Sequence, residues 1–266
     1  MEDEKNVCSH YYTAIDFYFV TGTGFRQTGL EKSPRHQEWV AVKQGERVVH
    51  NFLVFPEVKD KVTAVVVIHE NRGLTDWVRS VADQLAEAGY IAIAPDLLSG
   101  MAPSDGKTSD FPDGDAVREA ISKLPQEQVT ADLNAVADYV AKLSAANGKV
   151  AVAGFCWGGR QSFAFATNRA NLTAAFVFYG TGADSSDIAR IKCPVYGFYG
   201  GNDARVNATL PKTTELMKQA KKSFEPIIYE GAGHGFMRAG EEPNADAVNK
   251  KAREEAWKRW KTLLKR

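Results

Sequence analysis

The chain has 266 residues, of which 44% are apolar, and its 33 basic residues balance its 33 acidic ones. This size and apolar content suffice for a substantial globular core, whereas a formal net charge of zero gives no electrostatic attraction to nucleic acid or to an anionic membrane surface. No apolar run approaches the roughly 18–20 residues of a membrane-spanning helix, and the three widely spaced cysteines fit neither a disulfide framework nor a metal site.

The N-terminal segment, residues 1–29, follows no pattern to which a structure can be assigned. It starts with the acidic "MEDEKN" and lacks the basic start and small-residue cleavage site of a signal peptide, which favours a cytoplasmic protein. No linker rich in Pro, Gly or Ser divides the rest of the chain. We therefore expect an N-terminal extension over residues 1–29 and a single domain over residues 30–266.

Regular patterns begin near residue 38. The stretch "EWVAVKQGERVVHNFLVFP" alternates apolar and polar residues around "QGE" and predicts an antiparallel hairpin. The β-branched run at 63–69 is typical of a strand covered on both faces. In "WVRSVADQLAEAG" the apolar residues fall on one helical stripe, and Gly89 is placed to end the helix.

Strands and helices then alternate. Strands are predicted at 90–96, 149–154, 174–180, 193–200 and 224–231, and helices at 126–146, near 209–222 and from about 244. This alternation predicts an α/β protein with a mostly parallel, doubly wound sheet, of which the first hairpin forms an antiparallel edge. The long loop 99–114 follows a strand at its carboxyl end, so it is expected either to line a ligand pocket or to be a mobile surface connection.

One turn carries a candidate nucleophile. "AVAGFCWGG" matches the Gly-x-nucleophile-x-Gly turn between a strand and a helix, with Cys156 at the position of the nucleophile. The start of a helix favours a thiolate, and the backbone N–H of Trp157 points into the same space as an oxyanion donor. The alternative is a buried, inert cysteine, which is the interpretation we favour for Cys193.

A cysteine nucleophile needs a base and a group that orients the base. Asp203 in "YGGNDARV" and His234 in "YEGAGHGF" each follow a predicted strand at its carboxyl end. The chain order Cys156, Asp203, His234 is the order of nucleophile, acid and histidine in α/β-hydrolases. Taken alone, Asp203 is equally well an ordinary turn residue.

These motifs, together with "VVVIHENRGLTDWVRSVADQLAEAGYIAIAPDLLSG" and "GAGHGFMR", resemble the dienelactone hydrolase family over residues 34–264. The resemblance implies an α/β-hydrolase fold without a large lid, a triad of Cys156, His234 and Asp203, and hydrolysis of lactone or ester bonds. It implies no cofactor. The natural partner would be a small lactone or ester, with or without a carboxylate.

The resemblance also gives a role to Glu70 of "HEN", which in this family interacts with the resting cysteine and helps to activate it. A carboxylate beside a thiol favours the protonated thiol, and this limits its oxidation. The alternative for Glu70 is an ion pair or a helix cap. "HENRG" is not a zinc motif, because Gly73 stands where a second histidine would be needed. By analogy, the N–H of Asn71 is the second oxyanion donor.

Substrate recognition is the least specified feature. Arg238 matches a family position that holds a substrate carboxylate, and Arg72 and Tyr179 are further substrate-binding candidates. Most arginines are simply surface residues, which is the alternative for both of these. Asn71 and Gly235 depart from the residues that many relatives have, so dienelactone itself is less well supported as substrate than the hydrolase machinery.

The sequence thus predicts a cysteine hydrolase of the dienelactone hydrolase (carboxymethylenebutenolidase) type that works through an acyl-thioester as a monomer or small homo-oligomer. A general carboxylesterase or thioesterase with the same residues is the nearest alternative, and it would be indifferent to a substrate carboxylate. A non-catalytic ligand-binding protein with Cys156 as redox sensor is the alternative from another class.

Overall fold

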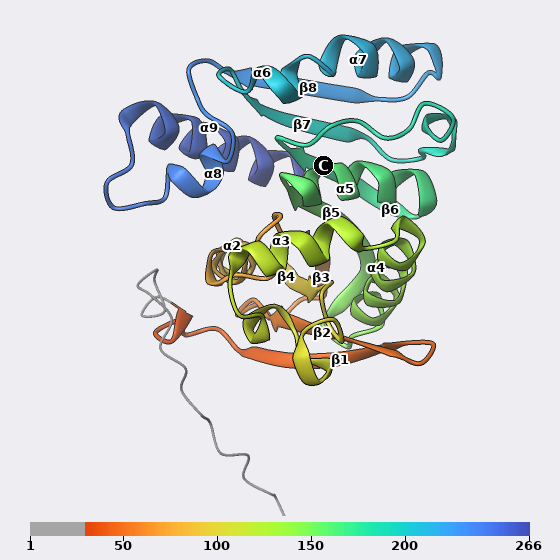
Figure 1. Ribbon diagram of the computed structural model, residues 1–266, viewed down its shortest axis with the longest axis vertical. Coiled ribbons are helices and arrows are strands. Elements are labelled where there is room, and N and C mark those ends of the chain that lie inside the picture. The colour runs from red at the N-terminus through yellow and green to blue at the C-terminus, as the bar shows by residue number, and fades with distance from the viewer. Residues whose placement is uncertain (1–29) are drawn as a thin grey trace, which may run out of the picture.

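The computed structural model describes residues 30–266. In this part of the chain eight strands form one sheet in the order β1-β2-β4-β3-β5-β6-β7-β8 (Figure 1). The strands are β1 (Gln37–Gln44), β2 (Arg47–Val54), β3 (Val62–Ile68), β4 (Ile91–Asp96), β5 (Ala146–Phe155), β6 (Leu172–Phe178), β7 (Val195–Gly200) and β8 (Phe224–Tyr229). Strand β2 pairs antiparallel with both β1 and β4, and the other pairs are parallel. The predicted antiparallel edge hairpin is confirmed.

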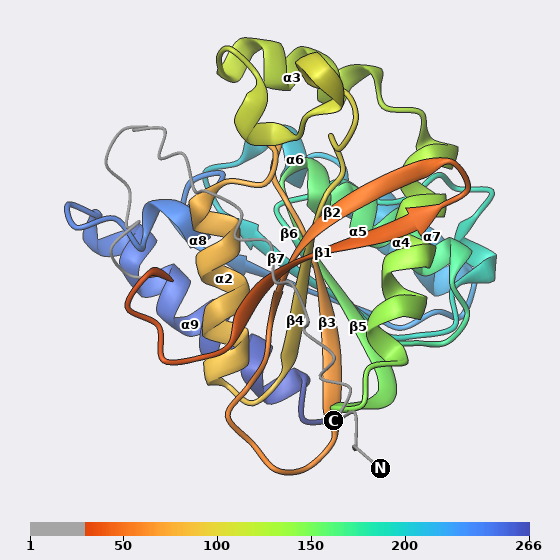
Figure 2. The ribbon, with the colours of Figure 1, turned by 90° about the horizontal axis from the view of Figure 1, so that it is seen from below.

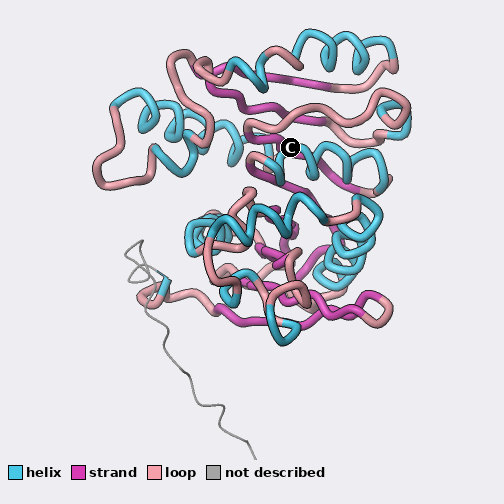
Figure 3. Tube along the Cα trace, in the orientation of Figure 1, coloured by secondary structure: helices cyan, strands magenta, loops and turns pink. Residues whose placement is uncertain are grey.

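Helices cover both faces of the sheet, so the prediction of a doubly wound α/β fold is confirmed. Figure 2 shows the two helical layers on either side of the strands, and Figure 3 distinguishes helices from strands by colour. One layer contains α2 (Asp76–Glu87), α8 (Phe236–Ala239) and α9 (Ala247–Leu263). The other layer contains α4 (Gln126–Ala141), α5 (Trp157–Asn168) and α7 (Leu210–Gln219).

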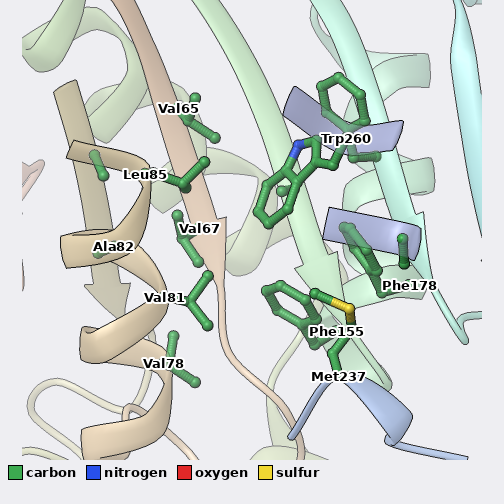
Figure 4. Close-up of a cluster of buried hydrophobic side chains, with 14 of the residues drawn as sticks. Val65, Val67, Val78, Val81, Ala82, Leu85, Phe155, Phe178, Met237 and Trp260 are labelled. Atoms are coloured by element: carbon green, nitrogen blue, oxygen red, sulfur yellow. The ribbon is translucent and has the colours of Figure 1, made fainter. Parts of the chain in front are cut away.

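The parallel strands are apolar on both sides because each face carries its own core. In β3, Val65 and Val67 face the layer of α2, whereas Val66 faces the layer of α4. Figure 4 shows Val65 and Val67 opposite the apolar stripe of α2, with the fully buried Trp260 of α9 in the same cluster. Alternating residues of one strand thus anchor both layers, and this holds the strand ends rigidly in place.

Two connections differ from the sequence-based prediction. Helix α4 ends at Ala141 rather than at residue 146, because β5 already begins at Ala146. After β4, the segment 99–114 contains two short 3₁₀ turns and leads into a helix that was not predicted, α3 (Gly114–Lys123). Only three α3 residues are buried, packing with Leu98 in a small cluster of their own. Figure 2 places α3 beyond the carboxyl ends of the central strands.

Two expectations about the ends and the environment of the chain need separate mention. The expected N-terminal extension, residues 1–29, lies outside the described residues. Within residues 30–266, every helix is too short or too polar to cross a membrane.

Candidate active site

The turn between β5 and α5 is as sharp as the glycine spacing predicts. Cys156 lies at its apex with φ 56° and ψ −114°, a conformation that residues with a side chain rarely adopt. A Cβ on Gly154 would lie 1.9 Å from the carbonyl oxygen of Gly158, and one on Gly158 would lie 2.4 Å from that of His69. Glycine is therefore required at both positions, because backbone occupies the space of a side chain.

Backbone hydrogen bonds hold Cys156 in this conformation. Its N–H donates to the carbonyl of Phe178 on β6 at 3.0 Å, and its own carbonyl accepts from Gly159 and Arg160 at 3.0 and 3.3 Å. The side chain is partly exposed, at the carboxyl ends of the strands. The following residue, Trp157, is the first of α5, so its N–H has no partner within the helix.

The loops after β7 and β8 bring Asp203 and His234 together. Nδ1 of His234 lies 2.5 Å from Oδ2 of Asp203, which is 6% exposed on its side chain, compared with 33% for the histidine. The other carboxylate oxygen, Oδ1, accepts from the N–H of Val206 at 3.3 Å and caps α6 (Ala204–Asn207). Asp203 is thus fixed by the helix that it caps and aimed at the imidazole by the same geometry.

The imidazole of His234 also reaches Cys156. Hydrogen bonding with the Cys156 side chain is the largest influence on it and, with the contribution of Asp203, raises the pKa of His234 to about 9 against the opposing effect of burial. The ring of Tyr179 packs edge-on against it at 5.1 Å between centroids. The structure therefore brings Cys156, His234 and Asp203 into one chain of contacts, with the histidine in the middle.

Glu70, two residues after the end of β3, forms an ion pair with Arg238. Its Oε2 accepts from Nε of Arg238 at 3.0 Å, and its side chain is 5% exposed. Nη1 of Arg238 also lies 3.5 Å from Oε1 of Glu242. The guanidinium of Arg238 is thus held by the buried carboxylate of Glu70, with the more exposed carboxylate of Glu242 beside it.

The turn 70–74 after β3 carries Asn71 and is tied to the segment after β4. The hydroxyl of Thr108 accepts from the N–H of Leu74 at 3.1 Å and donates to the carboxylate of Asp96 at 2.7 Å. The preceding residue, His69, is buried and stacks on the indole of Trp157 at 5.3 Å. Burial lowers the pKa of His69, which makes it a neutral packing residue.

A cavity of about 330 Å³ opens onto Cys156, and Asn71 and Trp157 line it as well. The N–H groups of the latter two donate no hydrogen bond within residues 30–266. The buried Tyr179 also lines the cavity, and burial raises the pKa of its hydroxyl well above 10. The segment 99–114 contributes none of the lining residues; the helix that follows it, α3, does so instead.

Three arginines that the sequence did not single out line this cavity: Arg118, Arg160 and Arg205. They come from α3, α5 and α6, and no acidic side chain is among the described residues that line it. Of the two arginines that the sequence did single out, Arg238 is paired with Glu70, and Arg72 is exposed and lies outside the lining. For two of them a signal was present in "CWGGR" and "NDAR", where Arg160 lies four residues after Cys156 and Arg205 lies two residues after Asp203.

No group of three or more His, Cys, Asp or Glu side chains within residues 30–266 is arranged to hold a metal ion.

Comparison with known proteins gives a family. The model described as "Dienelactone hydrolase family" matches residues 49–266. A protein of Escherichia coli K12 named "Putative carboxymethylenebutenolidase" is 33% identical over 210 aligned residues, which cover 73% of each chain. A protein of the same name from Saccharolobus solfataricus is 31% identical and covers 82% of this chain and 94% of its own.

Solved structures agree on the fold. A "Putative Dienelactone Hydrolase" from Klebsiella pneumoniae superposes with a TM-score of 0.76 over 87% of this chain and 99% of its own, at 24% identity. The sheet order, the antiparallel second strand and the sharp turn after β5 define an α/β-hydrolase. The chain belongs to the dienelactone hydrolase family, and it is a hydrolase that acts on lactone or ester bonds.

Proposed function

We propose that this hydrolase cleaves a lactone or small ester with Cys156 as its nucleophile and forms an acyl-thioester. The observation that carries the proposal is the position of His234, which contacts both the Cys156 side chain and the carboxylate of Asp203. A side chain between a nucleophile and an orienting acid is the arrangement that acyl transfer requires. The partner is a small molecule, and the reaction needs no cofactor.

In the first half of the reaction, the Cys156 thiol gives its proton to His234, and the resulting thiolate attacks the carbonyl carbon of the substrate. The carbonyl oxygen becomes an oxyanion, which the N–H groups of Trp157 and Asn71 stabilise by hydrogen bonds that strengthen as the charge develops. The bond between the carbonyl carbon and the leaving oxygen then breaks. Protonated His234 donates its proton to that oxygen, which opens the lactone ring or releases the alcohol.

In the second half, water replaces the thiolate. His234 removes a proton from a water molecule, whose oxygen attacks the thioester carbon, and the carbon–sulfur bond breaks. Asp203 holds the imidazole in the tautomer that has its free nitrogen toward the site and stabilises the imidazolium that forms. The products are a carboxylate and an alcohol, and Cys156 returns to its initial state.

Glu70 and Arg238 have a positioning role in this proposal. Glu70 is buried shortly after the end of β3, and Arg238 balances the charge of its carboxylate. We assign recognition of a substrate carboxylate to Arg118, which lines the cavity and within residues 30–266 pairs only with the exposed Asp115. Arg238, in contrast, pairs with the buried Glu70 and lies outside the lining. Tyr179 provides an apolar wall beside His234.

The test follows the ultraviolet absorbance of a carboxylated dienelactone mixed with the purified protein, with the Cys156→Ala variant as the blank. Decay with the wild type alone is the expected result. Decay with both proteins would exclude Cys156 as nucleophile. If the wild type opens no lactone but hydrolyses phenyl acetate in a Cys156-dependent way, the enzyme is an esterase rather than a lactonase.

The second candidate is a general carboxylesterase or thioesterase that uses the same residues. The observation in its favour is the ion pair of Arg238 with the buried Glu70, since the resemblance implies that Arg238 holds the substrate carboxylate. Such an enzyme would hydrolyse neutral and carboxylated esters with similar values of kcat/KM.

A further inference from the structure

The cavity beside Cys156 has a basic wall that the reaction itself does not use. Arg160 lies in the first turn of α5, four residues after the nucleophile, and Arg205 lies in α6, two residues after Asp203. Both line the cavity together with Thr181 and the backbone of Gly180. Because the chain as a whole has no net charge, this concentration of positive charge is a local property of the site.

The charges of these two arginines are poorly neutralised. Arg160 reaches the carbonyl of Gly182 at 3.4 Å and the carboxylate of Asp184 at 3.5 Å, and the side chain of Asp184 is 74% exposed. An exposed ion pair at this distance contributes little. Arg205 makes no hydrogen bond or ion pair with any residue in the range 30–266. This contrasts with Arg238, whose charge is balanced by Glu70 at 3.0 Å.

The basic wall is separate from Arg118. In the view of Figure 1, α3, which carries Arg118, lies below α5, whereas α6 with Arg205 lies above it. Arg118 pairs with Asp115 on its own helix. Cys156 immediately precedes α5, and the three helices that carry Arg118, Arg160 and Arg205 each contribute to the lining of the cavity at Cys156.

We propose that Arg160 and Arg205 form a second anion subsite, so that the preferred substrates carry one carboxylate on the acyl half and another on the alcohol half of the ester or lactone. This inference rests on the proposed function, because it places the scissile bond between Arg118 and the basic wall. The planar guanidinium of arginine suits a carboxylate, to which it can donate two parallel hydrogen bonds.

The experiment compares four esters that differ only in their carboxylates: phenyl acetate, phenyl hemiglutarate, 4-carboxyphenyl acetate and 4-carboxyphenyl hemiglutarate. We expect each carboxylate to raise kcat/KM of the wild type about tenfold, which is the low end for a charge-assisted hydrogen bond at a solvent-accessible site. The two effects should multiply, and both should shrink as the ionic strength rises.

The variants assign each carboxylate to a subsite. Arg160→Met and Arg205→Met are expected to abolish the tenfold effect of one carboxylate, and Arg118→Met that of the other. The readout is the ratio of kcat/KM between charged and neutral ester within each variant, which cancels general damage to the site. Arg190→Met is the matched control, since Arg190 pairs with Asp187 outside the cavity. Its ratios should equal those of the wild type.

Two results would overturn the second subsite. One is that Arg160→Met and Arg205→Met keep the wild-type ratios of kcat/KM between charged and neutral esters. The other is that these variants and Arg118→Met all lose the effect of one and the same carboxylate. If no ester is hydrolysed, the proposed function fails, and the subsite is tested instead by the binding of a dicarboxylate. Adipate should then raise the thermal midpoint of the wild type but not that of Arg205→Met, with butyrate as the monocarboxylate control. No shift with adipate would refute the subsite as well.

Discussion

The two cysteines among the described residues show how far the surroundings decide the chemistry of one side chain. Cys156 has a backbone conformation with positive φ, lines a cavity and contacts His234. Cys193 precedes β7 in an ordinary turn, packs in the core against the α4 layer and is 6% exposed. Burial raises the pKa of Cys193 to about 11, so it remains a neutral thiol at physiological pH.

The difference between the two cysteines comes from the backbone around each of them and not from neighbouring charges alone. At Cys156, two glycines allow strand and helix to approach until carbonyl oxygens fill the space of their side chains. This forces the cysteine outward, toward the ends of the strands where Asp203 and His234 also lie. A cysteine without such a turn becomes one more small core residue, as Cys193 does.

The largest effect that would test this comparison is expected from Asp203→Asn. The amide can keep the cap on α6 but can also donate to Nδ1 of His234, which would favour the wrong tautomer. We expect kcat to fall by about 10²- to 10⁴-fold, the usual contribution of acid–base catalysis. Steady-state kinetics with phenyl acetate measures it.

The control for Asp203→Asn is Asp246→Asn, because Asp246 caps α9 with its side chain in the same way but far from the cavity. Unchanged kinetics are expected for this variant. If Asp203→Asn retained full activity, the contact between Asp203 and His234 would have a structural role only. The contrast between Cys156 and Cys193 would then be one of exposure and not of function.

The next largest effect is expected from Gly158→Ala. Its methyl group would lie within 2.5 Å of the carbonyl oxygens of both Ile68 and His69, which belong to the backbone of the neighbouring strand and cannot rotate away. Overpacking of this kind costs about 1–3 kcal/mol. Denaturant unfolding of Gly158→Ala measures the loss of stability. Gly114→Ala, near only the flexible side chain of Arg118, should change stability by less than about 0.5 kcal/mol.

A smaller effect should appear in the pH dependence of stability. The pKa of His234 is about 9 in the folded protein and about 6.5 in an unfolded chain. Folding therefore favours the protonated imidazole, so its stabilisation is complete below about pH 6.5 and is lost as the pH rises through about 9. Because a third of the side chain is exposed, we expect a loss of only about 1 kcal/mol between these values.

The Cys156→Ala variant sharpens this measurement, since hydrogen bonding with Cys156 is the largest cause of the raised pKa of His234. Its free energy of unfolding should fall less between pH 6.5 and 9 than that of the wild type. An equal fall in both proteins would mean that the cysteine and the histidine do not interact in solution.

The fold could be predicted well where the sequence pattern and the packing have the same cause. The edge hairpin and the parallel strands follow from alternation and from apolar runs, because burial on one or both faces produces these patterns directly. Helix α3 was missed although its buried Val117, Ala120 and Ile121 fall at i, i+3 and i+4, because it has only 10 residues and directly follows a segment rich in turn residues. The end of α4 was misplaced because β5 begins earlier than its apolar core suggests.

The candidate site likewise has a part that the sequence predicted and a part that it did not. The positions of Cys156, Asp203 and His234 follow from local motifs at strand ends, and parallel strands bring such ends together. The pairing of Arg238 with Glu70 joins residues 168 positions apart, and the basic wall depends on where α3 and α6 lie over the sheet. Contacts of this kind arise from tertiary packing, so local patterns did not reveal them.

The smallest effect is expected at the other cysteine. Cys193→Ala removes a buried thiol from the core without touching the cavity, so kcat/KM for phenyl acetate should equal that of the wild type, and stability should fall by about 0.5–1 kcal/mol. In the native wild-type protein, iodoacetamide followed by peptide mass spectrometry should label Cys156 and leave Cys193 unlabelled, because a buried neutral thiol is a poor nucleophile. Labelling of Cys193 at a comparable rate would mean that this part of the core opens readily, and the contrast between the two cysteines would then be one of dynamics rather than of backbone geometry.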